Sequence, residues 1–274
     1  MVELEGQVAV VTGAGSGIGR RAALRLAQLG VRPALISRSE AALAETAALI
    51  EADGGRAYIA AGDVSDPGEV EAMKNRIEKD MGAPTILVNA AGIFGPIQLV
   101  WKTDPSEWIR TQMVNTVGPY LTCRAFAENM IEVGWGRIIN VTSAAALHEP
   151  GPINSAYGTS KAALNQFTRH LASEISETGV TANVIHPGDV KTAMWAEIRD
   201  AASELGSEAS RYQEWAEWVD ETGGDDPEKA SDLIVALLSD KSASINGRFL
   251  WIKDGLQSPI ASWGEFLPNE VWAD

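Results

Sequence analysis

The chain has 274 residues, 45% of them apolar, and a formal charge of −15 from 22 Lys and Arg against 37 Asp and Glu. This composition is typical of a folded globular protein and excludes disorder over most of the length. The acidic charge would repel a phosphate backbone or an anionic bilayer, so we expect neither nucleic acid nor a membrane as a partner.

Cysteine and histidine usage points away from disulfides and metals. Cys123 is the only cysteine, and the three histidines are scattered, so no disulfide within the chain and no zinc-ligand spacing is expected. The first residues lack the basic and apolar regions of a secretory signal, and no apolar run approaches the ~20 residues of a membrane span. We therefore expect a cytoplasmic protein without a metal.

Predicted strands and helices alternate along the chain. Short apolar runs predict strands at 7–12, 33–37, 56–61, 85–89, 137–142, 180–186 and 246–252. Helices are predicted at 17–30, 39–53, 67–81, 104–114, 116–133, 154–178 and 227–239, with Ser39 and Asp66 as caps. This alternation predicts an α/β fold, a doubly wound (Rossmann) parallel sheet of seven strands with helices on both faces.

No break in composition divides residues 1–256, so a single domain is expected there. Residues 190–224 look polar and irregular, and we expect them to form a lid over the substrate. The tail 257–274 carries four large apolar side chains, so we expect it to pack on the domain or on a partner subunit.

A glycine-rich stretch joins the first strand to the first helix. It reads Thr12-Gly-Ala-Gly-Ser-Gly-Ile-Gly19, which is T-G-x-x-x-G-x-G rather than the general G-x-G-x-x-G pattern. Missing side chains let a backbone approach a pyrophosphate, and the helix N-terminus offers free N–H groups to it. The alternative is a plain tight turn. We expect a dinucleotide at Gly13, Ser16, Gly17, Ile18 and Gly19.

The end of the second strand predicts which dinucleotide binds. NAD sites usually carry a carboxylate there, whereas this chain has Ser37 followed by Arg38. No acid would repel a 2′-phosphate, and a guanidinium could pair with it, so NADP(H) is favoured over NAD(H). The alternative is an ordinary surface arginine at a helix start.

A tyrosine and a lysine share one helix face. Tyr157 and Lys161 are four residues apart, so both can reach one point, and an ammonium there would lower the pKa of the phenol. Ser143 follows the fifth strand, at the carboxyl edge where open α/β sheets bind ligands. Asn115 breaks two helical stretches, where its amide could hold a water. A solvated helix face is the alternative for the Tyr–Lys pair alone.

Together these motifs resemble those of the short-chain dehydrogenase/reductases of the common single-domain, 3-oxoacyl reductase-like type. They occur in the family's order over roughly residues 4–256: Thr12-Gly13-x-x-x-Gly17-x-Gly19, Asp63-Val64, Asn89-Ala-Ala-Gly92, Asn115, Ser143, Tyr157-x-x-x-Lys161 and Pro187-Gly188-x-x-x-Thr192. The family's usual second asparagine is Ala90 here.

The resemblance implies roles for these residues. Tyr157 would exchange the proton, Lys161 would tune it and hold the nicotinamide ribose, Ser143 would polarise the carbonyl, and Asn115 would support a relay water. Asp63 and Val64 would meet the adenine; Asn89, Ala90 and Gly92 would line the adenosine ribose; Pro187, Gly188, Val190 and Thr192 would hold the nicotinamide end. Homotetramers or homodimers are usual in such enzymes.

The substrate pocket is expected between these elements and the segment 190–224. Candidate substrate-binding residues are Phe94, Ser143, Ala145, Leu147, Asn154, Tyr157, Met194 and Trp195. Trp215 and Trp218 are expected to pack in the core of the lid, His186 to be structural, and His148 to be an exposed loop residue. The expected reaction is NADP(H)-dependent transfer of a hydride to or from a carbonyl or secondary alcohol. The alternatives are an NAD-dependent alcohol dehydrogenase and a non-enzymatic nucleotide-binding scaffold.

Overall fold

The computed structural model describes residues 4–147 and 151–252. These residues form one parallel sheet whose strand order is β3-β2-β1-β4-β5-β6-β7. Its strands are β1 (Val8–Thr12), β2 (Arg32–Ile36), β3 (Tyr58–Ile59), β4 (Ile86–Asn89), β5 (Gly136–Val141), β6 (Val180–His186) and β7 (Phe249–Trp251). The predicted seven-stranded Rossmann-type fold is confirmed. The third and seventh strands are much shorter than their predicted ranges, 56–61 and 246–252.

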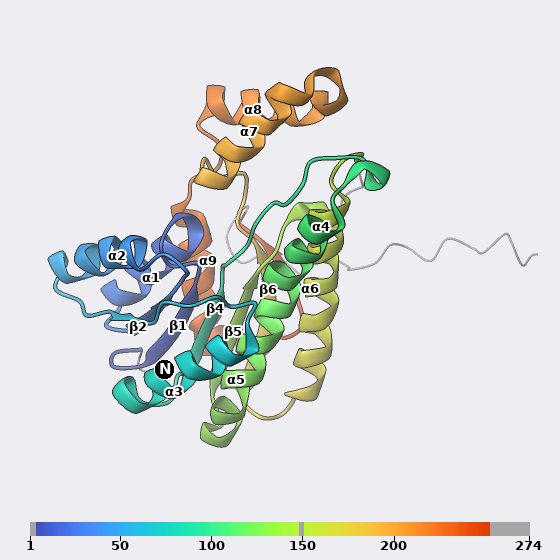
Figure 1. Ribbon diagram of the computed structural model, residues 1–274. Coiled ribbons are helices and arrows are strands. Elements are labelled where there is room, and N and C mark those ends of the chain that lie inside the picture. Colours follow the sequence, from blue (N-terminus) through green and yellow to red (C-terminus); the bar gives the residue numbers. More distant parts are fainter. Residues whose placement is uncertain (1–3, 148–150, 253–274) are drawn as a thin grey trace, which may run out of the picture.

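Helices cover both faces of the sheet (Figure 1). One face carries α1 (Gly17–Gln28), α2 (Glu40–Ala52) and α9 (Glu228–Leu238), and the other carries α3 (Pro67–Met81), α5 (Gly118–Val133) and α6 (Ser155–Glu174). The shorter α4 (Pro105–Gln112) packs on α6. The caps were predicted correctly, since Ser39 accepts from the Ala42 N–H and Asp66 from the Glu69 N–H.

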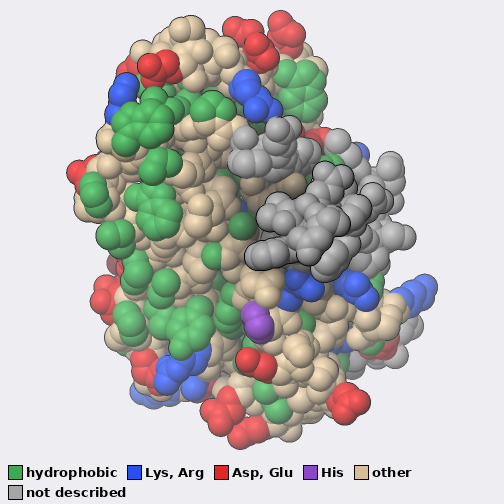
Figure 2. Space-filling model, turned by 90° about the vertical axis from the view of Figure 1, so that its right-hand side faces the viewer, with side chains coloured by type: hydrophobic (Ala, Val, Ile, Leu, Met, Phe, Trp, Pro, Cys, Tyr) green, Lys and Arg blue, Asp and Glu red, His purple; other side chains and the backbone are tan. Residues whose placement is uncertain are grey.

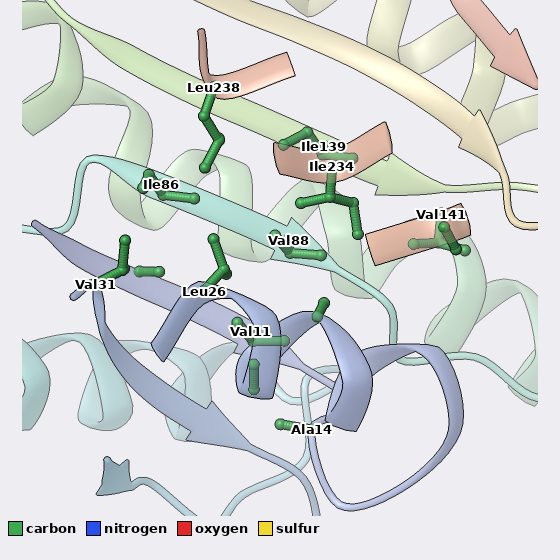
Figure 3. Packing of buried hydrophobic residues seen from close by; sticks show 14 of the residues in the cluster. Val11, Ala14, Leu26, Val31, Ile86, Val88, Ile139, Val141, Ile234 and Leu238 are labelled. Atoms are coloured by element: carbon green, nitrogen blue, oxygen red, sulfur yellow. The ribbon is translucent and has the colours of Figure 1, made fainter. Parts of the chain in front are cut away.

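Successive side chains of β1 point to opposite faces of the sheet, so this apolar strand contributes to two hydrophobic clusters. Ala9 and Val11 belong to the cluster under α1 and α9, whereas Val8 and Val10 belong to the cluster under α3 and α5. Figure 3 shows the first cluster, in which Val11 of β1 lies with Leu26 of α1. A strand buried on both faces is apolar throughout, as the sequence predicted.

The segment 190–224, called the arm from here on, corrects the expectation of an irregular lid. It consists of α7 (Ala193–Leu205), a short 3-10 turn (Gly206–Ala209) and α8 (Ser210–Thr222), which project from the body at the top of Figure 1. Its apolar side chains are spaced for helices, with Ile198 and Ala202 buried on α7. Exposed charges between them made the segment look irregular.

The arm begins and ends at one place. Val190 and Gly224 form an antiparallel bridge, and the backbone N–H of Asp225 donates to the carbonyl of Asp189 over 2.9 Å. The Asp225 carboxylate accepts from the Asp189 N–H at the same distance. These bonds join both ends of the arm to the carboxyl edge of the sheet.

Two other expectations change or fall outside the described residues. The stretches 104–114 and 116–133 are not separated by a break, because a π-helical turn (Met113–Val117) joins α4 to α5. His148 and the tail 257–274 lie outside the described residues. Among the described helices, none combines the length and apolar character needed to cross a bilayer.

Candidate active site

The carboxyl ends of β1, β4, β5 and β6 open onto a cleft of about 450 Å³. Strand order reverses between β1 and β4, the position at which open α/β sheets bind ligands. The glycine loop, Arg38, Ser143, Tyr157 and the first turn of α7 all line this cleft.

The glycine loop is packed too closely for side chains. A Cβ on Gly13, whose φ is +67°, would lie 2.8 Å from the backbone of Ala90. One on Gly19 would lie 2.6 Å from the carbonyl carbon of Gly13. Ser16, Gly17 and Ile18 also line the cleft at the N-terminus of α1, where free backbone N–H groups favour an anion.

A second hollow adjoins the glycine end of the cleft. It is lined by Ser37, Arg38, Asp63 and Val64, together with the backbone around Gly92. Arg38 is exposed and makes no ion pair or hydrogen bond with any other residue in the described ranges. The neighbouring Arg20 is different, because its guanidinium donates to the carbonyl of Gly15 and to the Glu45 carboxylate.

Asp63 is held in place by its own neighbours. Its Oδ1 accepts from the N–H of Ser65 over 2.9 Å and from the hydroxyl of Ser65 over 2.6 Å, and Arg110 lies 3.6 Å from its other oxygen. Burial opposes ionisation, but the Ser65 hydrogen bonds and the positive charges of Arg110 and Arg38 keep the pKa of this carboxyl below its usual value. Asp63 is therefore an ionised, fixed acceptor beside the hollow.

Asn89 does not reach the cleft with its side chain. Its amide donates to Asn140 Oδ1 over 2.9 Å and to Cys123 Sγ over 3.6 Å, and its carbonyl accepts from Thr122 over 2.7 Å. The amide is thus committed to a buried network that ties β4 to β5 and α5, while Ala90 and Gly92 do line the cleft. Cys123 is buried, and burial raises the pKa of its thiol to about 12, in agreement with the predicted unreactive cysteine.

Ser143, Tyr157 and Lys161 come together in the cleft as the spacing predicted. Lys161 Nζ donates to the carbonyl of Val141 over 2.9 Å and lies 5.6 Å from the centre of the Tyr157 ring. Ser143 begins a 3-10 turn (Ala144–Ala146), and its hydroxyl accepts from the Ala145 N–H. The segment that follows β5 and the helix α6 therefore both contribute to this part of the cleft.

Burial works against the predicted lowering of the tyrosine pKa. Burial raises the pKa of Tyr157 to about 12; hydrogen bonding with Ser143 opposes the rise and the negative charge of Asp189 adds to it. Burial also lowers the pKa of Lys161 to about 8. Loss of water around the phenol disfavours the phenolate more than the neighbouring ammonium favours it.

Asn115 lies in the π-helical turn and is completely buried. Its carbonyl accepts from the N–H of Ile93 over 2.9 Å, and its amide donates to the Ile93 carbonyl and to Ser160. Both amide hydrogens are bonded within the protein, so a water held by this side chain would have to donate to its oxygen. The asparagine clamps the loop after β4 to the helix that carries Tyr157.

The segment after β6 lines the same cleft through Pro187, Gly188, Val190 and Thr192. Gly188 has a φ of +82°, and a Cβ there would lie 2.7 Å from Asp225 Oδ2, so only glycine fits. Thr192 caps α7 by accepting from the Trp195 N–H. His186, expected to be structural, also lines the cleft, and its Nδ1 accepts from the Ala144 N–H.

The predicted substrate residues divide into two groups. Phe94, Met194 and Trp195 line the cleft with Ser143 and Tyr157, whereas Ala145, Leu147 and Asn154 do not line it. Ala145 lies in the 3-10 turn after Ser143, and Leu147 ends that turn.

Sequence reasoning missed part of the lining. Ile198 and Trp215 of the arm line the cleft, and Tyr212 packs edge-on against Phe94 at 5.8 Å. Helical spacing across 193–222 is the signal that could have found them. Trp218, expected in the lid core, is 45% exposed. In the described ranges, no group of three or more His, Cys, Asp and Glu side chains is placed to hold a metal.

Similar proteins were found by sequence and by structure. The family model "short chain dehydrogenase" matches residues 7–203. A "Short-chain type dehydrogenase/reductase" of Picea abies is 33% identical over 92% of this chain and 93% of its own. An "NADPH-dependent aldehyde reductase-like protein, chloroplastic" of Arabidopsis thaliana is 38% identical over 70% of this chain and 75% of its own.

Two solved structures are similar over most of their length. An NAD⁺-bound xylitol dehydrogenase is 28% identical with a TM-score of 0.84, over 92% of this chain and 99% of that one. An actinorhodin polyketide ketoreductase variant with NADPH is 28% identical with a TM-score of 0.82, over 92% and 97%. With its Rossmann-type sheet and the matched region from residue 7 to residue 203, the chain belongs to the short-chain dehydrogenase/reductase family and is an oxidoreductase of that class.

Proposed function

We propose that this protein is an NADP(H)-dependent oxidoreductase that interconverts a carbonyl compound and a secondary alcohol, with Tyr157 as the acid and base. The observation that carries the cofactor preference is the unpaired guanidinium of Arg38 beside Ser37, in a hollow continuous with the glycine loop. A phosphate on the adenosine ribose would give that guanidinium a partner.

The residues of the cleft fit the cofactor from end to end. Gly13, Ser16, Gly17, Ile18 and Gly19 would hold the pyrophosphate, Ser37, Arg38, Asp63 and Val64 the adenosine end, and Pro187, Gly188, Val190 and Thr192 the nicotinamide end. When bound, this cofactor supplies or accepts the hydride. The similar solved structures include both an NAD⁺ and an NADPH complex, so the fold accepts either cofactor. In this chain, Arg38 would distinguish between them.

Two side chains would bond to the substrate oxygen, and a third would support them. Tyr157, kept protonated by burial, would donate its proton to the oxygen during reduction and accept one during oxidation. Ser143 would donate a hydrogen bond to the same oxygen. Lys161 would hold the nicotinamide ribose and provide positive charge beside the phenol when the phenolate forms.

Asn115 would act indirectly. Its three hydrogen bonds fix the loop that carries Phe94 and Gly92 against α6, which keeps the cofactor and Tyr157 in register. The arm would close over the substrate, because its first turn supplies Met194 and Trp195 to the cleft.

The experiment measures nicotinamide absorbance with NADPH and NADH in parallel against a panel of ketones and aldehydes. The proposal predicts turnover with NADPH at least about tenfold more efficient than with NADH. A preference for NADH would overturn the cofactor assignment and favour an NAD-dependent alcohol dehydrogenase. Binding of the cofactor without turnover of any carbonyl or alcohol would favour a non-enzymatic scaffold.

We also propose that the protein is a homo-oligomer in the cytoplasm. Large apolar side chains are exposed on and before α4 and on α5, among them Trp101 at 79%, Ile109 at 56% and Val133 at 61%. Hydrophobic side chains are also visible over much of one face in Figure 2. Such surface favours a homodimer or homotetramer, and the reduced, buried Cys123 suits the cytoplasm.

A further inference from the structure

Aromatic rings gather around Tyr157 at the cleft. Phe94 stacks on the ring of Tyr157, with 4.6 Å between the centroids and 29° between the planes. Tyr212 of α8 meets Phe94 edge-on at 5.8 Å. Both rings belong to an apolar cluster that also includes Ile198 and Trp215 from the arm. The rings support one another and keep the reacting phenol in a fixed orientation.

The arm presents mainly apolar side chains to the cleft. Met194, Trp195, Ile198 and Trp215 line it, and Glu197 is the only ionisable side chain among the arm residues that do so. A substrate body lying between Phe94 and the arm would therefore meet mainly apolar surface. Lys191 and Arg199 lie over the ring of Trp195, 4.9 and 4.8 Å from its centre, but neither lines the cleft.

The outer surface of the arm is strongly acidic. Residues 190–224 contain eight Asp and Glu against three Lys and Arg, a charge of −5. All eight acids are exposed, and two of the three cations are already paired, Lys191 with Asp220 and Arg199 with Asp200. A negatively charged substrate approaching the mouth of the cleft would be repelled by this surface.

From these observations we propose that the substrate is an uncharged ketone, or the corresponding secondary alcohol, whose body is an apolar ring system. This inference rests on the proposed function and narrows its substrate class. A rigid ring gains aromatic contacts and loses little rotational freedom on binding, whereas a flexible chain of equal size loses more. The acidic arm disfavours substrates carried as anions, including acyl thioesters on acidic carriers.

Two matched pairs of ketones test the proposal, each assayed with NADPH and with NADH. The first pair is 1-tetralone and 2-decanone, which have the same number of heavy atoms but differ in rigidity. We expect kcat/KM to be at least about tenfold higher for 1-tetralone. The second pair is methyl 4-acetylbenzoate and 4-acetylbenzoate, which share a ring and differ in charge. The ester should be favoured by about tenfold at low salt, and less at 1 M salt, where the Debye length is about 3 Å.

Variants on the arm show which side chains cause the preference for a ring and for an uncharged substrate. Trp215→Leu should lower kcat/KM for 1-tetralone by about tenfold and that for 2-decanone by about twofold, because the ring contact is lost and apolar bulk is kept. Trp218→Leu is the matched control, since Trp218 is on the same helix but is 45% exposed and does not line the cleft. Glu197→Gln should reduce the discrimination between ester and carboxylate.

The outcomes separate this inference from the proposed function. Turnover of 2-decanone at a rate equal to or above that of 1-tetralone, or equal use of ester and carboxylate, would overturn the inference and leave the proposed function standing. Failure of all four ketones and of a panel of small aldehydes with both cofactors would overturn both. Equal losses in the Trp215 and Trp218 variants would overturn the inference, because the effect would then not come from contact between Trp215 and the substrate ring.

Discussion

Replacing Arg38 should separate the two nicotinamide cofactors. The side chain is exposed beside Ser37 and makes no hydrogen bond or ion pair within the described ranges. Its removal therefore breaks no direct contact, although it withdraws a positive charge that lowers the pKa of Asp63. Hydrogen bonds between a guanidinium and a phosphate net roughly 1.5–3 kcal/mol, which corresponds to about 10- to 100-fold in the Kd of NADPH. Because the site is exposed, the lower half of that range is expected for Arg38→Ala.

Reversing the charge should have a larger effect. Two like charges about 4 Å apart in water repel by about 1 kcal/mol, so Arg38→Asp adds roughly fivefold to the loss. Binding of NADH should change by less than about twofold in Arg38→Ala, because a free 2′-hydroxyl does not need the guanidinium. Arg25→Ala is the control, since Arg25 is an exposed arginine that pairs with Asp232 on the outer face of α1 and α9.

The assay is direct titration of NADPH and NADH, followed by energy transfer from protein tryptophan to the reduced nicotinamide. Equal weakening of both cofactors in Arg38→Ala would refute the reasoning, because it would mean that Arg38 supports the fold of the site rather than the 2′-phosphate. No change in either would refute it as well.

Three further outcomes follow from the described contacts. Because burial lowers the pKa of Lys161 to about 8, its positive charge is present below that pH and lost above it, so kcat/KM for reduction should fall as pH rises through about 8. Gly19→Ala should abolish cofactor binding in titrations, since its Cβ would overlap the carbonyl of Gly13; Gly158→Ala, whose Cβ would lie 3.7 Å from its nearest neighbour, should bind normally. Asn89→Ala should lower the free energy of unfolding by about 1–3 kcal/mol in urea titrations without changing the Kd of either cofactor, because it leaves buried hydrogen-bond partners unpaired.

The sequence predicted the sheet and the cofactor end of the site because their signals are local. A strand buried on both faces is apolar throughout, and the glycine loop is a run of eight residues between a strand and a helix. Tyr157 and Lys161 are one helical turn apart, so their proximity follows from helix geometry alone.

The arm and the electrostatics could not be predicted in the same way. The contact of Tyr212 with Phe94 joins residues more than a hundred positions apart, and no local pattern indicates it. The raised pKa of Tyr157 arises from burial by several elements, which residue spacing does not reveal. The commitment of the Asn89 and Asn115 amides to internal partners likewise depends on packing between elements.

The role of Tyr157 is tested most directly by comparing hydride transfer in the wild type and in Tyr157→Phe. The substitution keeps the ring that stacks on Phe94 and removes only the hydroxyl. The account predicts that single-turnover oxidation of bound NADPH by a ketone slows by about 10²–10⁴-fold, while the Kd of NADPH stays unchanged. Hydride transfer at the wild-type rate in Tyr157→Phe would contradict the account, because the proton would then come from another group.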